Sequence, residues 1–88
     1  MVFLIHCTVD KQKKHLRETL VERHLANVAA NKSSLVFGGV VGSDDDPFQR
    51  IIYFLTADSK QRARAFIEND AYSALYRDIE IEEFHQRI

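Results

Sequence analysis

The order of strand and helix patterns along the 88-residue chain predicts a single α+β domain, residues 1–88, with a ferredoxin-like βαββαβ arrangement. In this arrangement two helices pack on one face of an antiparallel sheet. Three observations support the prediction: short runs rich in β-branched and aromatic residues, two longer runs with helical spacing, and a first strand that is apolar on both faces. A chain this short buries only about 60% of its unfolded surface, so its own core is small.

The first two elements are expected to be a strand and a helix. Val2–Val9 is short and rich in β-branched and aromatic residues, which favours a strand. Lys13–Ala30 contains neither Gly nor Pro, and its apolar residues recur at helical intervals. These apolar residues are Leu16, Leu20, Val21, Leu25, Val28 and Ala29.

A hairpin is expected to follow the first helix. Leu35–Val41 has the composition of a strand and ends among glycines, and Ser43–Pro47 has the composition of a turn. Phe48–Thr56 again favours a strand. The short connection predicts that these two strands are antiparallel neighbours.

The last third of the chain predicts a second helix, a short turn and a final strand. Asp58 or Ser59 can cap the helix, whose buried face would be formed by Ala63, Phe66 and Ile67. Asn69-Asp70 ends this helix, and Asp70 can cap a short turn over Ala71–Tyr76. Ile79–Phe84 alternates apolar and acidic residues, as half-exposed strands do.

The first strand predicts that the chain pairs with a second copy of itself. Its first half, Val2 to Ile5, is apolar on both alternating faces, but the helices cover only one face of the sheet. A sheet from another chain, packed at about 10 Å, would cover the other face. We therefore expect a homodimer.

Composition and charge exclude several classes of protein. The net charge of −1 argues against nucleic acid as the main partner, and no apolar run is long enough to span a membrane. Cys7 is the only cysteine and no Cys/His cluster has zinc-ligand spacing, while Asp44-Asp45-Asp46 lacks the ligand spacing of a calcium loop. The start of the chain does not have the pattern of a secretory signal. We therefore expect a cytoplasmic protein with no metal site and no cofactor.

Two polar residues lie within the apolar face of the first predicted helix. Arg17 and His24 are about two helical turns apart, in the middle of the arc that runs from Leu16 to Leu25. An arginine buried without a partner is costly, so this arc either faces a polar pocket or lets Arg17 reach water. His24 in a pocket could exchange a proton near neutral pH, whereas in a filled interior it would be a satisfied core histidine.

Asp70 is the strongest candidate partner for His24. A carboxylate fixes the tautomer of a histidine base and stabilises its charged form. Asp70 lies at a helix break, from which its side chain can project, although its position also suits a plain N-cap. Tyr72 can wall the same pocket or simply pack, and His6, which faces away from Phe3 and Ile5, can line a pocket.

These residues resemble the motifs of the YciI-like (YCII-related) family. Arg17 to His24-Leu25 resembles the family's "R…HL" helix, Gly39 is similar to its glycine-proline strand end, and Asp70-Ala71-Tyr72 resembles its "DPY" segment. The chain departs from the family at Val40 and Ala71, where prolines are usual. The resemblance implies a dimeric α+β barrel with a His–Asp pair, here His24 and Asp70. It also implies that dehydrochlorination of a chlorinated hydroquinone is open to the fold.

The sequence therefore predicts a small cofactor-independent enzyme that eliminates from, or isomerises, a small organic anion. His24 would be the general acid and base, Asp70 its orienting group, and Arg17 the cation that neutralises the ligand, with Gly39 and Tyr72 as walls. The alternative is a non-catalytic domain, in which the same residues hold a small ligand or satisfy a dimer interface.

Overall fold

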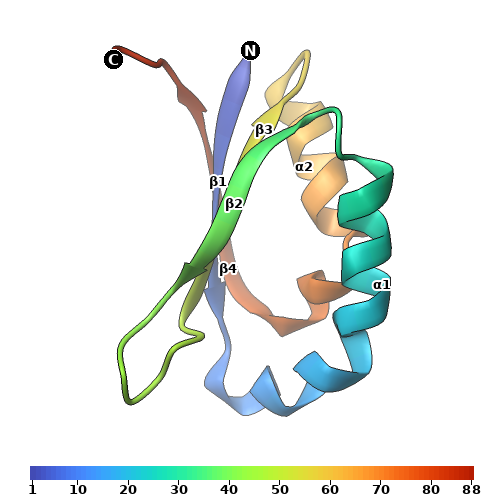
Figure 1. Ribbon diagram of the computed structural model, residues 1–88, viewed down its shortest axis with the longest axis vertical. Coiled ribbons are helices and arrows are strands. Elements are labelled where there is room, and N and C mark those ends of the chain that lie inside the picture. The colour runs from blue at the N-terminus through green and yellow to red at the C-terminus, as the bar shows by residue number, and fades with distance from the viewer.

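The computed structural model describes all 88 residues as a four-stranded antiparallel sheet with both helices on one face (Figure 1). The elements are β1 (Val2–Val9), α1 (Arg17–Ala30), β2 (Leu35–Val41), β3 (Arg50–Thr56), α2 (Lys60–Asn69) and β4 (Tyr76–Phe84). Two 3₁₀ helices, η1 (Lys11–Leu16) and η2 (Ala71–Leu75), precede α1 and follow α2. The strand order is β2-β3-β1-β4. The predicted ferredoxin-like α+β fold is therefore confirmed. No helix has the length and apolar character needed to cross a bilayer.

Three element boundaries differ from the sequence prediction, each for a local reason. The predicted first helix divides into η1 and α1, because the side chain of Asp10 accepts from the Gln12 amide (2.9 Å) and starts a 3₁₀ helix there. β3 begins two residues later than predicted, since the Phe48 amide turns toward the carboxylate of Asp46. β4 begins earlier, at Tyr76, which pairs with Val9 beyond a bulge in the ladder.

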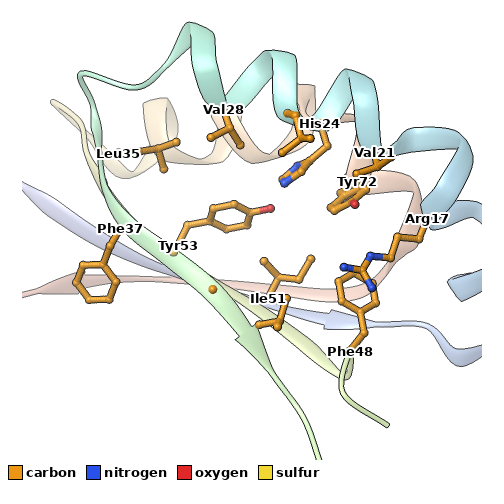
Figure 2. Close-up of a pocket in the computed structure, with 14 residues that line it drawn as sticks. Arg17, Val21, His24, Val28, Leu35, Phe37, Phe48, Ile51, Tyr53 and Tyr72 are labelled. Atoms are coloured by element: carbon orange, nitrogen blue, oxygen red, sulfur yellow. The ribbon is translucent and has the colours of Figure 1, made fainter.

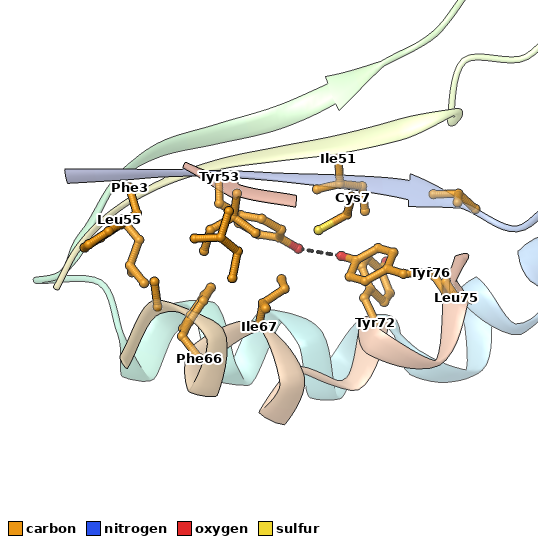
Figure 3. Packing of buried hydrophobic residues seen from close by; sticks show 14 of the residues in the cluster. Phe3, Cys7, Ile51, Tyr53, Leu55, Phe66, Ile67, Tyr72, Leu75 and Tyr76 are labelled. Atoms are coloured by element: carbon orange, nitrogen blue, oxygen red, sulfur yellow. Dashed lines mark hydrogen bonds between the residues drawn. The ribbon is translucent and has the colours of Figure 1, made fainter. Parts of the chain in front are cut away.

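The core lies between the sheet and α2. Every second residue of β1 and β3 points into it, and the facing residues of α2 fill it (Figure 3). These side chains are Phe3, Ile5, Cys7, Val9, Ile51, Tyr53, Leu55, Ala63, Phe66 and Ile67. By contrast, Leu20 is the only buried residue of α1, and Leu25, predicted to face the core, is 57% exposed. The first helix therefore stands away from the sheet.

Cys7 lies in the core, on the face of the sheet that the helices cover. Burial raises the pKa of its thiol to about 12, although a hydrogen bond with Tyr76 acts in the opposite direction. The thiol is therefore neutral at physiological pH. Strand alternation turns the neighbouring His6 to the other face of the sheet, so the two side chains form no thiol–imidazole pair.

The opposite face of the sheet carries an apolar patch, and none of the chain's helices covers this face (Figure 1). Phe54 is at its centre, stacked on Phe37 with a centroid separation of 4.4 Å and packed edge-on against Phe84 at 4.9 Å. Strand alternation and register place three further apolar residues on this face: Val2, Leu4 and Ile52. We call these six residues the outer apolar face.

Candidate functional site

A pocket of about 390 Å³ occupies the gap between α1 and the β2–β3 hairpin (Figure 2). This volume lies within the range of small-molecule sites. Its walls are mainly apolar, and its lining includes Val21, Leu25, Val28, Leu35 and Ile51. Arg17 is the only lysine or arginine among the lining residues, and no Asp or Glu is among them. The pocket thus suits a small ligand that is flat or apolar and carries negative charge.

Two glycines of β2 affect the pocket in different ways. A Cβ at Gly38 would lie 2.9 Å from the carbonyl oxygen of Ile52, so only glycine lets the strands approach this closely. A Cβ at Gly39 would meet nothing within 4 Å. Gly39 lines the pocket, but its position would also accept a side chain.

His24 and Asp70 are brought together at one wall of this pocket. The imidazole Nδ1 lies 2.9 Å from Oδ1 of Asp70, and the His24 side chain is 13% exposed while that of Asp70 is fully buried. A carboxylate can only accept, so Nδ1 carries the hydrogen and donates it. Nε2 is then free of hydrogen in the neutral ring, with its lone pair available to a ligand. His24 lines the cavity and does not fill a closed interior.

Asp70 accepts three hydrogen bonds. Oδ1 also accepts the Tyr72 amide at 2.8 Å, as an N-cap does, and Oδ2 accepts Nδ2 of Asn27 at 2.7 Å. Burial alone raises the pKa of Asp70, but the bonds from His24, Asn27 and Tyr72 together outweigh it and hold the pKa below 3.8. Asp70 is therefore an anion at neutral pH, and it both caps η2 and orients His24.

Tyr72 fixes the plane of the imidazole. Its ring stacks on His24 with centroids 3.9 Å apart and planes within 6° of parallel. Tyr72 is buried and lines the pocket. The carboxylate and the aromatic ring together restrict both the rotation and the tilt of His24, which is the kind of preorganisation that proton transfer requires.

Arg17 lies at one end of the pocket, above an aromatic ring. Its guanidinium carbon is 4.0 Å from the centroid of Phe48, within cation–π range (Figure 2). The residue is exposed, so Arg17 avoids the desolvation cost of a buried cation while its head group stays at the pocket. A ligand anion at this end could pair with it.

His6 is the one predicted site residue that lies elsewhere. It belongs to the outer side of the sheet, where Nε2 is 3.4 Å from a guanidinium nitrogen of Arg50, and it is not among the residues that line the pocket. The structure therefore does not bring His6 to this pocket, because strand alternation sends its side chain away from the helices.

Sequence reasoning missed two polar members of the site, Asn27 and Tyr53. Asn27 follows His24 by three residues, so helical spacing alone could have placed it beside the same carboxylate. Tyr53 lines the pocket, and its hydroxyl lies 2.9 Å from that of Tyr76. The strand pattern of Phe48–Thr56 places Tyr53 only in the core, so no signal in the sequence pointed to its pairing with Tyr76.

No cluster of three or more His, Cys, Asp or Glu side chains is arranged to hold a metal ion. In the acidic turn, Asp46 pairs with Lys14, and this hydrogen bond is the main cause that lowers the pKa of Asp46.

Comparison with known proteins shows the fold of the chain. No family model matches the sequence, and no curated protein is significantly similar to it. Among solved structures, 5-chloro-2-hydroxyhydroquinone dehydrochlorinase from Burkholderia phenoliruptrix AC1100, in complex with 2,5-dihydroxybenzoquinone, superposes with a TM-score of 0.86 at 24% identity. The match covers 99% of this chain and 96% of that one. A NIPSNAP family protein from Agrobacterium tumefaciens strain C58 matches with a TM-score of 0.54 at 20% identity, over 92% and 87% of the two chains.

Proposed function

We propose that the chain is a cofactor-independent acid–base enzyme that acts on a small, flat, hydroxylated organic anion in the pocket beside α1. His24 is the group that moves protons, Asp70 holds it in the reactive tautomer, and Arg17 pairs with the negative charge of the ligand. The observation that carries this proposal is the 2.9 Å hydrogen bond from His24 Nδ1 to a fully buried carboxylate, in a residue that also lines an open pocket.

The shape and charge of the pocket support this ligand class. Apolar walls and the stacked ring of Tyr72 favour a planar apolar body, and the lone cation favours an anionic group. Dehydrochlorination is the reaction named for one of the structural neighbours, and the YciI-like resemblance implies the same chemistry. Hydroxylated benzene rings that carry a leaving group are therefore the substrates we propose.

Elimination from such a ring needs only proton transfers. With 5-chloro-2-hydroxyhydroquinone, Nε2 of His24 takes the proton of a ring hydroxyl and returns a proton to the carbon that bears chlorine. A second hydroxyl then loses its proton, its electron pair forms a carbonyl, and the carbon–chlorine bond breaks to release chloride. The net loss is one HCl, and the ring becomes a hydroxyquinone without any external oxidant. A positioned histidine is suited to both transfers.

Two measurements on the wild-type chain test this function. We expect 2,5-dihydroxybenzoquinone to shift the NMR signals of His24 and Tyr72, and we expect chloride release from 5-chloro-2-hydroxyhydroquinone above the rate in buffer. Binding without chloride release would favour the alternative, a non-catalytic ligand-binding domain. Absence of both would overturn the proposal.

We also propose that two copies pair through the outer apolar face. Only 17 of the 88 residues are buried, so the chain buries more apolar surface when a second copy covers this face. Two sheets packed face to face cover apolar surface in this way. The same face carries an acidic row on β4 (Asp78, Glu80, Glu82) and the cation of Arg50 on β3. A two-fold copy can therefore set acidic and basic groups against each other, as an isologous interface requires. This pairing is the dimeric α+β barrel that the YciI-like resemblance implies.

Phe54→Lys is expected to abolish pairing, because it puts a charge at the centre of the outer apolar face. Sedimentation velocity should give a dimer for the wild type and a monomer for the variant. Ala65→Lys, on the exposed side of α2, is the matched control and should remain dimeric. A wild-type chain that sediments as a monomer at every concentration would contradict the proposed dimer.

A further inference from the structure

Beneath His24, two buried tyrosines share a hydrogen bond that the proposed proton transfers do not use. The hydroxyls of Tyr53 and Tyr76 lie 2.9 Å apart, and either can be the donor (Figure 3). Both residues are at most 9% exposed. Tyr53 lines the pocket, and Figure 2 shows its hydroxyl directed toward the space between His24 and Tyr72. One end of the pair therefore faces the ligand and the other end faces the core.

The two hydroxyls have two hydrogens, and only one of these can lie between the oxygens. If Tyr76 donates to Tyr53, the hydrogen of Tyr53 is free to point into the pocket. If Tyr53 donates to Tyr76, the oxygen of Tyr53 offers a lone pair to the pocket, and the hydrogen of Tyr76 needs another acceptor. Figure 3 shows the side chain of Cys7 beside Tyr76, so its sulfur is placed to accept this hydrogen. Both arrangements thus place each hydroxyl hydrogen either on an acceptor in the core or in the pocket, where a ligand can accept it.

We propose that Tyr53 and Tyr76 form a reversible hydrogen-bond relay that lets Tyr53 donate to a carbonyl or enolate oxygen of the ligand and accept from a hydroxyl at the same place. Changing from one state to the other requires only rotation of two O–H bonds, with no net transfer of a proton. This inference rests on the proposed function and adds to it the means by which one site holds both a hydroxylated substrate and its quinone product.

The surroundings of the pair keep both hydroxyls neutral. Burial raises the pKa of Tyr53 and of Tyr76 well above the ordinary value of 10. The negative charge of Asp70 raises both pKa values further. The relay therefore works by hydrogen bonding alone, and His24 remains the group that carries protons.

Two isosteric variants and two probes separate a relay from simple packing. The acceptor probe is 2,5-dihydroxybenzoquinone, whose oxygens are carbonyl or enolate acceptors at neutral pH, and the donor probe is hydroquinone. Tyr53→Phe should weaken binding of both probes about tenfold, since the contacting hydroxyl is lost. Tyr76→Phe should change the affinity for the acceptor probe by less than about twofold. The same variant should weaken the binding of hydroquinone about fivefold, because the hydrogen of Tyr53 then has no acceptor in the core.

The difference between the two probes in Tyr76→Phe is the readout that a structural role would not produce. Loss of packing or stability would lower both affinities together, and thermal unfolding of each variant measures that contribution. If Tyr53→Phe binds both probes as the wild type does, or if Tyr76→Phe affects them equally, the relay is refuted while the proposed function stands. If the wild type binds neither probe, the proposed function and the relay fail together.

Discussion

Replacing His24 with glutamine is expected to lower kcat for chloride release by about 10²–10⁴-fold, the contribution typical of a positioned histidine acid–base. Glutamine keeps a polar side chain of similar length on α1 but cannot exchange a proton at neutral pH. The affinity for 2,5-dihydroxybenzoquinone should change far less, because the apolar walls and Arg17 remain. The loss should therefore appear in kcat and not in KM, which marks an interaction made in the transition state.

His85→Gln is the matched control for this substitution. His85 is exposed after the end of β4, outside the pocket, and its only ionic contact is with Glu83. Its kcat should equal that of the wild type. A His24→Gln enzyme that retains full kcat would exclude His24 as the proton-transfer group and with it the proposed mechanism.

Replacing Asp70 with alanine is expected to lower the free energy of unfolding by about 3 kcal/mol, since three buried donors lose their acceptor at about 1 kcal/mol or more each. Asp70→Asn should cost less, because its amide oxygen still accepts and asparagine caps helices well. Urea unfolding at neutral pH measures both effects.

The contribution of Asp70 should depend on pH in a defined direction. Its pKa is lower in the folded chain than the ordinary value of 3.8, so the folded state binds this proton less readily than the unfolded state. The stabilisation is therefore complete above about pH 4 and is lost as the pH falls through the folded pKa. The difference between wild type and Asp70→Asn should shrink in acid.

Asp58→Ala is the control for these measurements. Asp58 is an exposed carboxylate beside the start of α2, where Ser59 and not Asp58 accepts the Arg62 amide. This substitution should change stability by less than about 0.5 kcal/mol at any pH. If Asp70→Ala were no more destabilising than the control, the three hydrogen bonds would have no role in holding the site.

The strands and the second helix could be reached from sequence, because each rests on local spacing. His24 and Asp70 could be named as candidate partners from the position of each in its own element and from the YciI-like resemblance, although they are 46 residues apart. Arg17 and His24 interrupt an apolar helix face, and Asp70 stands where a helix must end. The sequence does not predict that α1 lies away from the sheet. Leu25 has the spacing of a core residue, and only the packing of the whole chain decides that it borders a pocket. The relay partner of Tyr53 depends equally on strand register, which the sequence of one strand does not contain.

Because α1 lies away from the sheet, the residues that form the core and the residues that line the pocket are largely different. Most of the side chains that form the core belong to the sheet, α2 and η2, whereas Leu25 and Val28 border the pocket and are not part of the buried cluster. Evolution can therefore exchange these two for larger or smaller residues, and so admit a different ligand, at small cost to folding. The proposed proton-transfer pair, held by the buried carboxylate of Asp70, would stay in place while the pocket acquired new substrates.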